Sequence, residues 1–268
     1  MLAKSGGFMM NYDDAQVKKL TGSGTRVKIM RALKDGPKNI SDLVRLIGAS
    51  DSTILHSVKA LIDEDVVERT QLGYALTNKG QIQSLLLENL ISGQAALNEY
   101  ESFWQAHDLS GIPAYLLEDI GKLSGGKCVG DDADELLKSQ TLFIESISKA
   151  KNIWGVSPII APGYVEMILS LLDQKANITL ILTDSIIKKI DSGAIQKCLS
   201  AKNFRLYNIP EIKVAFTVTD ENLFLGLFYR NGTYDAHNDL VCSGKAAVDW
   251  GKFLFMYYLN KSQRVLSV

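Results

Sequence analysis

Short polar side chains and one lysine cluster between residues 50 and 59 of this chain. Hydroxyl, imidazole and ammonium groups of this kind are the ones that meet base edges and phosphates in the major groove of duplex DNA. The set consists of Ser50, Ser52, Thr53, His56, Ser57 and Lys59. We expect these side chains to bind double-stranded DNA; the alternative is that they form the solvated face of an ordinary helix.

Three short amphipathic helices must position this polar set. Apolar residues recur at helical spacing within residues 27–33, 43–47 and 54–62, and Gly36-Pro37 and Gly48 end the first two runs. Ser50 or Asp51 caps the third helix. Because the apolar residues of that helix face inward, the polar set is expected outside, where the reading helix of a helix-turn-helix meets DNA.

A short hairpin follows the third helix directly. Residues 66–70 and 74–76 have strand character, and Gly73 lies in the turn between them. Arg69, Gln71 and Tyr74 fall on this predicted wing and complete the expected DNA-binding set. A plain three-helix packing unit with a surface hairpin is the alternative, and the wing's place directly after the third helix favours DNA binding.

The charge distribution fits a DNA-reading module attached to a domain that does not bind DNA. Residues 15–90 carry 11 Lys and Arg against 8 Asp and Glu, whereas the whole chain has a formal net charge of −1. So small an excess excludes a protein that coats nucleic acid without sequence preference. No apolar run is long enough to span a bilayer, and no secretory leader is evident. Cys128, Cys198 and Cys242 are far apart and odd in number, so we expect reduced thiols in a cytoplasmic protein with no membrane partner.

The length of 268 residues predicts two domains joined by a helix. We expect a flexible arm over residues 1–14, a winged helix-turn-helix over 15–80, a linker or dimerisation helix over 81–106, and an α/β domain over 107–268. The helix should run from residue 78 to residue 105, with a weak point at Gly93. It could pack on its own domain, act as a spacer, or pair with its twin in a homodimer, the form in which operators are usually read.

Helical and strand-like segments alternate after residue 108 and predict an α/β domain with a mixed sheet, within an overall α+β or α/β fold class. We expect helices over 113–123, 134–150, 164–174, 194–199 and 245–258, and strands over 152–156, 178–182, 204–208, 214–219 and 223–229. Residues 121–130 are interpreted as a linker. His107 and Asp108 are interpreted as a hydrogen-bonding pair at a helix end, and His237 is expected in a polar loop.

Polar side chains beside aromatic ones at strand ends are the usual lining of a ligand cavity. The candidates for an effector site are Trp154, Ser157, Tyr164, Thr183, Asp220, Tyr234, Asp235 and Trp250, each of which also has an interpretation as a core or turn residue. Three scattered histidines cannot form a metal site within one domain, and no glycine-rich phosphate loop is present. We therefore expect a small-molecule effector, with no cofactor and no metal.

Three segments after residue 106 resemble archaeal regulators of the FilR type, which are found in methanogens. They are HDLSGIPAYLLEDIGKL at 107–123, AKNIWGVSPIIAPGY at 150–164, and IKVAFTVTDENLFLGLFYRNGTYDAHNDLVCSGKAAVDWGKFLFMYY at 212–258. With the winged helix in front, the resemblance covers nearly the whole chain. It implies a cytoplasmic transcription regulator with a sensor or effector domain, linked to methane metabolism, and it implies no particular effector.

The same region resembles, more faintly, the phospholipase D-like half-domain, which sugar-sensing archaeal regulators use in similar form as a binding module. The enzymes need a His and a Lys two residues apart, and an Asp five residues beyond the Lys. Alignment of that Asp with Asp220 puts Lys213 and Ala215 at the other two positions, so the nucleophile and the phosphate-holding cation are missing. We predict a dimeric, sequence-specific regulator and no enzyme. The alternatives are a phospholipase D-like hydrolase and an adaptor whose winged helix contacts proteins.

Overall fold

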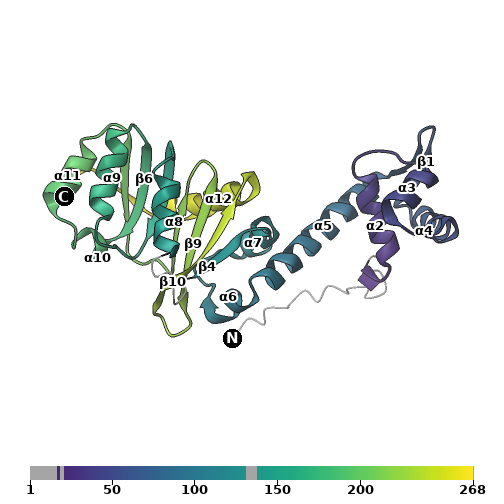
Figure 1. Cartoon of the computed structure of the whole chain (residues 1–268), viewed down its shortest axis with the longest axis horizontal. Helices are drawn as coiled ribbons and strands as arrows, with labels where there is room; N and C mark the ends of the chain where they lie inside the picture. The colour runs from purple at the N-terminus through teal and green to yellow at the C-terminus, as the bar shows by residue number, and fades with distance from the viewer. Residues whose placement is uncertain (1–16, 19–20, 131–137, 268) are drawn as a thin grey trace, which may run out of the picture. The chain divides into compact units, whose positions relative to one another are not determined.

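The computed structural model describes residues 17–18, 21–130 and 138–267, which belong to two compact units (Figure 1). The N-terminal unit lies within residues 1–91 and the C-terminal unit within residues 92–268. The arm predicted for residues 1–14 falls outside the described residues. In the described part of the chain, no helix combines the length and the apolar character needed to cross a membrane.

From residue 24 onward, the described part of the N-terminal unit forms three helices, a hairpin and the start of a fourth helix, in the order predicted for a winged helix-turn-helix. The elements are α2 (Gly24–Leu33), α3 (Ile40–Ile47), α4 (Asp51–Asp63), β1 (Val67–Thr70), β2 (Gly73–Leu76) and α5 (Asn78–Glu99). The side chains of Ser23, Asn39 and Ser50 accept backbone N–H groups at the starts of α2, α3 and α4. Gly48 ends α3 in the left-handed region, at φ 72°, which a glycine adopts without strain.

The helix after the wing is shorter than the sequence predicted. α5 ends at Glu99, and α6 (Glu101–Ala106) follows after Tyr100, whose backbone has φ −125° and ψ 37°. The break occurs here and not at Gly93 because tertiary contacts fix the following residues. The buried Tyr100 hydroxyl donates to the carbonyl of Leu123 at 3.2 Å, and the Trp104 indole N–H donates to the carbonyl of Ala96 at 2.9 Å.

The C-terminal unit is built on one mixed sheet, as predicted. Its strand order is β11-β7-β6-β5-β8-β9-β10-β4, with β3 paired to β9. β5, β6 and β7 are parallel, and the other pairings are antiparallel. The strands are β3 (His107–Asp108), β4 (Lys127–Gly130), β5 (Asn152–Ser157), β6 (Asn177–Thr183), β7 (Phe204–Ile209), β8 (Val214–Val218), β9 (Asn222–Tyr229), β10 (Tyr234–Ser243) and β11 (Gln263–Val265).

Helices pack against both faces of this sheet (Figure 1). The sheet therefore separates two apolar cores. One core is covered by α8 (Lys138–Ile147), α9 (Tyr164–Asp173), α10 (Asp184–Ile187) and α11 (Ser192–Leu199). The other is covered by α6, α7 (Ala114–Leu117), the 3-10 helix η1 (Ile120–Leu123) and α12 (Lys245–Leu259). Alternate residues of a strand point to opposite faces. In β5, therefore, Ile153 packs in the α8/α9 core and Val156 in the α12 core.

Several segments of the C-terminal unit differ from the sequence-based expectations. The helix expected over 113–123 is divided into α7 and η1, and the linker expected over 121–130 contains the end of η1 and the strand β4. His237 lies in β10 and not in a polar loop. The register of β10 against β9 shifts between Tyr234 and Asp239, and this bulge broke the alternation by which the strand would have been recognised.

Candidate functional site

The outward face of α4 carries most of the polar set predicted to bind DNA. Ser52, Thr53, His56 and Lys59 are exposed. Ser50 caps the helix: its hydroxyl oxygen accepts the Thr53 backbone N–H at 3.3 Å and lies 2.8 Å from the Thr53 hydroxyl. The start of α4 is therefore held in place by its own hydroxyl groups.

Ser57 differs from the other predicted residues because its side chain is buried, with 6% of the residue exposed. It follows Ile54 by three positions and precedes Leu61 by four, and both of these are core residues. Leu55 occupies an outward position instead and is 47% exposed. Ser57 therefore packs in the core and is not part of the exposed face.

The wing presents Arg69 and Gln71 to solvent. Arg69 is paired with Tyr74 across the hairpin, and its guanidinium carbon lies 5.7 Å from the centre of the tyrosine ring. Backbone hydrogen bonds join Tyr74 in both directions to Lys38, which precedes α3, at 2.8 and 2.9 Å. The half-buried Tyr74 thus anchors the wing on the helical core and supports the exposed arginine.

Lys59 and Arg69 differ in their partners from three other arginines of the N-terminal unit. Arg26, Arg31 and Arg45 form ion pairs with Glu64, Glu88 and Asp42 respectively. Among the residues that the structure describes, neither Lys59 nor Arg69 forms an ion pair. Their charges are therefore available to a phosphate backbone.

A cavity of about 170 Å³ lies in the C-terminal unit, on the face of the sheet covered by α8 and α9. Three of the eight predicted effector residues line it: Ser157, Tyr164 and Tyr234. The Ser157 hydroxyl is also engaged within its own turn, since it donates to the carbonyl of Ile159 at 2.7 Å. The sequence therefore identified part of one hollow site.

The other five predicted effector residues do not line this cavity. Trp250 is fully buried, with its indole N–H donating to the carbonyl of Leu116 at 2.9 Å. Trp154 packs against the α12 core, because even-numbered positions of β5 face that side, and the Lys252 ammonium lies 4.7 Å from its ring centre. The Thr183 hydroxyl lies 2.9 Å from that of Ser185.

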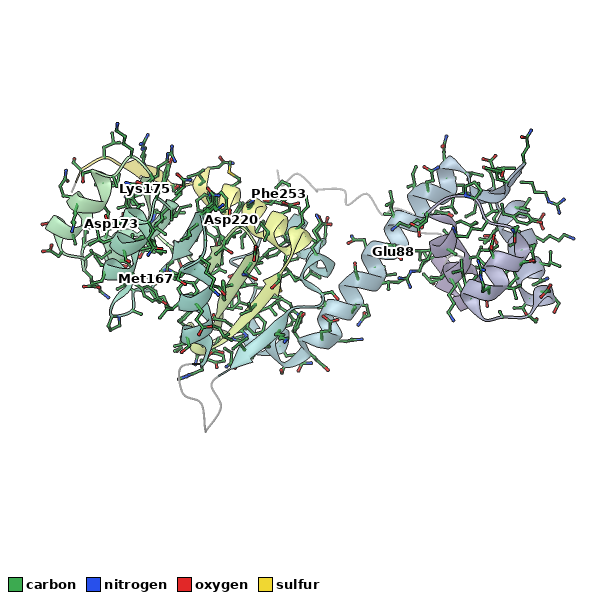
Figure 2. The ribbon with its side chains drawn as sticks, turned by 45° about the horizontal axis from the view of Figure 1, so that its top comes forward. Glu88, Met167, Asp173, Lys175, Asp220 and Phe253 are labelled. Carbon is green, nitrogen blue, oxygen red and sulfur yellow. The ribbon has the colours of Figure 1, made fainter. Side chains whose placement is uncertain are left out.

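Asp220 stabilises the start of β5 (Figure 2). Its carboxylate accepts the backbone N–H groups of Lys151 at 2.7 Å and Asn152 at 3.0 Å, and the Asn152 amide at 2.7 Å. Burial raises the pKa of Asp220, but these hydrogen bonds outweigh it and hold the pKa below the usual value. Asp220 is therefore an ionised turn residue outside the cavity.

Domain models of the family described as methanogenesis regulatory protein FilR1 match two parts of the chain. The N-terminal domain matches residues 14–93, and the middle domain matches residues 137–261. Methanogenesis regulatory protein FilR1 of Methanothrix harundinacea (strain 6Ac) is 30% identical over an alignment of 258 positions, which covers 93% of this chain. The chain belongs to the FilR1 family. It spans 58% of the length of that curated relative.

Solved structures share the general arrangement of the FilR1-family chain only loosely. TrmBL2, an archaeal chromatin protein, is 13% identical, with 92% of this chain and 97% of that chain covered at a TM-score of 0.44. NucT from Helicobacter pylori is 12% identical, with 52% and 98% covered at a TM-score of 0.41. Likenesses this distant support no statement about the function of the FilR1-family chain.

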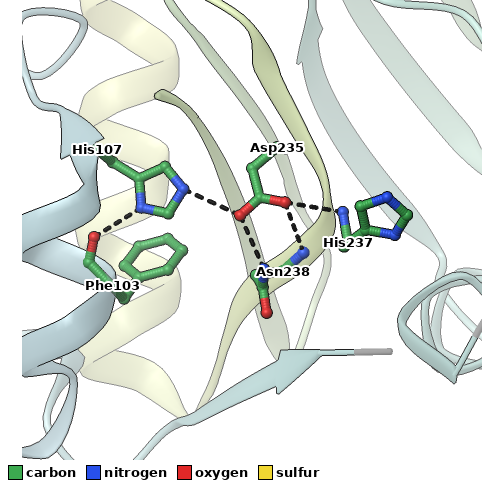
Figure 3. A network of polar contacts seen from close by, with 5 residues as sticks. All are labelled: Phe103, His107, Asp235, His237 and Asn238. Carbon is green, nitrogen blue, oxygen red and sulfur yellow. Dashed lines mark hydrogen bonds and ion pairs between the residues drawn. The ribbon is translucent and has the colours of Figure 1, made fainter. Parts of the chain in front are cut away.

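The FilR1-family chain also contains a buried histidine–carboxylate pair that the sequence did not reveal (Figure 3). His107 was predicted to pair with Asp108, but its Nε2 lies 3.1 Å from Oδ2 of Asp235, 128 positions away. Both side chains are almost completely buried, with 2% and 0% exposed. Asp235 also accepts the backbone N–H groups of His237 and Asn238, at 2.9 and 3.2 Å, and the Asn238 amide at 2.9 Å.

The ring of His107 lies between two acceptor groups. Its Nδ1 lies 2.6 Å from the carbonyl oxygen of Phe103, which can only accept, and its Nε2 faces the Asp235 carboxylate. Burial raises the pKa of Asp235, but hydrogen bonds, of which the Asn238 amide gives the largest effect, lower it overall. Asp235 is therefore the common acceptor of this network, and its contact with Nε2 helps to fix the orientation of the imidazole.

Several cavity residues were missed by sequence reasoning. Phe143, Met167, Phe224, Gly226 and Asp239 all line the cavity. Gly226 had a recognisable signal, because a glycine inside a strand often marks the close approach of another group. Asp239 had none, since its strand was not recognised. Within residues 17–18, 21–130 and 138–267, no cluster of three or more His, Cys, Asp or Glu residues is suited to a metal ion.

Proposed function

We propose that this FilR1-family chain is a cytoplasmic, sequence-specific DNA-binding transcription regulator of a methanogenic archaeon. The observation that carries the proposal is the exposed polar face of α4, with Lys59 and the wing residue Arg69 unengaged in ion pairs among the described residues. The family description, methanogenesis regulatory protein, supports the process that is regulated.

The proposed binding mode places α4 in the major groove. Ser52, Thr53 and His56 then reach base edges, and Lys59 reaches a phosphate from the same face. Arg69 and Gln71 contact the backbone from the wing. The small positive charge of the N-terminal region suits a reader of one sequence better than a general DNA coat, whose affinity would rest on many phosphate contacts.

The proposal is tested by selecting fragments of the source genome with the purified full chain near physiological salt. We expect fragments that share an inverted repeat, and at least tenfold weaker binding for Lys59→Ala and Arg69→Ala. Lys202→Ala, which changes an exposed lysine of the C-terminal unit, is the matched control. Failure of the folded protein to select any fragment would favour the alternative of an adaptor that contacts proteins.

We propose further that the regulator is a homodimer held by an apolar stripe on α5. Ile82, Leu85, Leu86 and Leu90 recur at helical spacing and are 62%, 61%, 62% and 58% exposed. Ser84 and Leu87, on another side of the same helix, are buried. A second copy is the natural occupant, because two-fold dimers read the two half-sites of an operator.

The molar mass of the full chain in solution tests the homodimer. We expect Leu86→Gln with Leu90→Gln to convert a dimer into a monomer, because both changes place amides in the paired stripe. Leu46→Gln, a change at an exposed leucine of α3, should leave the dimer intact. A monomeric wild-type chain at micromolar concentration would contradict the proposed stripe.

We propose that the C-terminal unit modulates DNA affinity by binding a small-molecule effector in its cavity, and that it is not an enzyme. Coupling of this kind is typically worth about 1–3 kcal/mol between the two ligands. Two observations argue against a phospholipase D-like hydrolase. Asp220 accepts backbone hydrogen bonds, and Ala215 has only a methyl side chain where the enzymes have a lysine. Phosphodiester hydrolysis that disappears in Asp220→Asn, a variant chosen to keep the fold, would restore that alternative.

A further inference from the structure

The cavity of the C-terminal unit has a floor of small residues on neighbouring strands. Gly155 of β5 pairs with Thr217 of β8, and Ala215 of β8 pairs with Gly226 of β9. Gly226 in turn pairs with Asp239 of β10. Apart from Asp239, none of these residues has a side chain larger than that of threonine. The sheet therefore leaves space beneath α8 and α9 that larger side chains would fill.

Gly226 is needed at the closest point of this floor. A Cβ atom there would lie 2.3 Å from the hydroxyl oxygen of Tyr234 and 2.8 Å from Oδ1 of Asp239. Both polar groups therefore converge over the glycine. The bulge between Tyr234 and Asp239 brings the two side chains together, because it inserts extra residues between positions that pair with neighbouring parts of β9.

The lining divides into an apolar body and a polar end. Phe143, Met167 and Phe224 represent the apolar part, and the Phe143 and Phe224 rings meet edge to face at 5.3 Å. Tyr164, Tyr234 and Asp239 form the polar end, and among the lining residues in the described ranges Asp239 alone is charged. Burial and then the charge of Asp239 raise the pKa of both tyrosines, so both phenols stay protonated.

We propose that this cavity binds a small organic cation, an amine with a compact apolar body, with the ammonium group against Asp239 and the Tyr234 hydroxyl. The carboxylate offers about four acceptor positions, so a ligand ammonium adds to the contacts that Asp239 already makes. The phenol oxygen of Tyr234 can accept a second hydrogen bond from the same ammonium. An anionic ligand would meet the carboxylate and is repelled.

The cavity volume limits the size of the amine. An apolar cavity of about 150 Å³ holds one benzene molecule, so about 170 Å³ admits roughly seven non-hydrogen atoms. The identification of this site as the effector site rests on the proposed function, whereas the binding itself does not. Ligand binding is therefore measured first on the full chain without DNA.

Cyclohexylamine, cyclohexanol and cyclobutanecarboxylate form a charge series of cyclic molecules with the same number of non-hydrogen atoms. The amine is protonated at neutral pH, as a lysine side chain is. Calorimetric titration should show cyclohexylamine binding at least tenfold more tightly than cyclohexanol, as a charge-assisted hydrogen bond requires, and no measurable binding of the carboxylate. Equal affinity for amine and alcohol would overturn the cation assignment, and no binding of any of the three would overturn the site.

Variants test the residues assigned to each end. Asp239→Asn should remove the preference for the amine and retain cyclohexanol binding, whereas Ala215→Val should fill the floor and abolish both. Gly226→Ala should weaken amine binding because its methyl group displaces Tyr234 and Asp239. Asp173→Asn, the same chemical change at an exposed residue at the end of α9 (Figure 2), is the control, because Asp173 does not line the cavity. Loss of the amine preference in Asp173→Asn, or its persistence in Asp239→Asn, would refute the assignment.

A second measurement separates this inference from the proposed function. DNA affinity is compared with and without saturating cyclohexylamine. If the protein binds the amine but selects no DNA, the ligand site is supported and the proposed function as a regulator is overturned. If the protein selects DNA but binds no member of the charge series, the regulator is supported and the ligand site is overturned.

Discussion

Replacement of Asp235 by alanine removes the acceptor at the centre of a buried network. Its carboxylate accepts from the His107 ring, from two backbone N–H groups and from the Asn238 amide. In Asp235→Ala the His107 Nε2 lies in a 2% exposed position without an acceptor. The perturbation therefore creates unsatisfied buried donors.

The expected cost follows from these losses. One unsatisfied buried donor costs about 1–3 kcal/mol, and Asp235→Ala removes the acceptor of several donors at once. We expect the free energy of unfolding of the C-terminal unit to fall by about 3–5 kcal/mol, because donors that share one acceptor have losses that do not add in full. For a unit of this size the melting temperature should fall by roughly 6–20 °C.

Intrinsic tryptophan fluorescence measures this loss in one unit only. The three tryptophans, Trp104, Trp154 and Trp250, all belong to the C-terminal unit. Asp249→Ala, which removes a carboxylate paired on the surface with Lys245, should leave the melting temperature nearly unchanged. In a His107→Phe background the cost of Asp235→Ala should shrink. A loss below about 1 kcal/mol, or an equal loss in both backgrounds, would refute the coupling between Asp235 and His107.

Further predictions concern acid stability, the cap of α4 and the salt dependence of DNA binding. Asp220 and Asp235 have lowered pKa values in the folded protein. Their contribution to stability is therefore fully present above the unfolded pKa of about 3.9 and is lost as the pH falls through their folded pKa values. Fluorescence melts from pH 6 to pH 2 check this, and Asp220→Asn should flatten the dependence of the melting temperature on pH. Ser50→Ala should destabilise the N-terminal unit by about 1 kcal/mol, measured by hydrogen exchange in α4, whereas Ser41→Ala, at an exposed position inside α3, should not. Lys59→Ala should lower the slope of log affinity against log salt by about 1, and an unchanged slope would exclude its phosphate contact.

The winged helix was predictable because its local signals agree with its packing. Caps at Ser50 and Gly48 mark the helix ends, and the apolar spacing marks the buried faces. Ser57 was wrongly assigned to the exposed face of α4, because a small hydroxyl residue fits either side of a helix. The neighbouring Leu55 lies on the outward side instead. A polar residue in a polar-looking run gives no signal of burial.

The C-terminal unit was less predictable because its key contacts join distant segments. The parallel strands β5, β6 and β7 are apolar runs and were recognised. β10 alternates irregularly around its bulge, so Asp235 and Asp239 could not be assigned to faces of a sheet. Trp250 and Asp220 were chosen for their chemistry, but tertiary packing uses the one as a core residue and the other as a turn residue.

The same distant contacts set the order in which the two units can form during synthesis. The hydrogen bonds from Trp250 to Leu116 and from Tyr258 to Gly111 close loops of 134 and 147 residues. The N-terminal unit ends at residue 91, so its residues leave the ribosome before most of the C-terminal unit is made. The segment 100–123 must wait for α12 with its aromatic side chains uncovered. The protein therefore most needs protection from aggregation after residues 100–123 have been synthesised and before α12 has been.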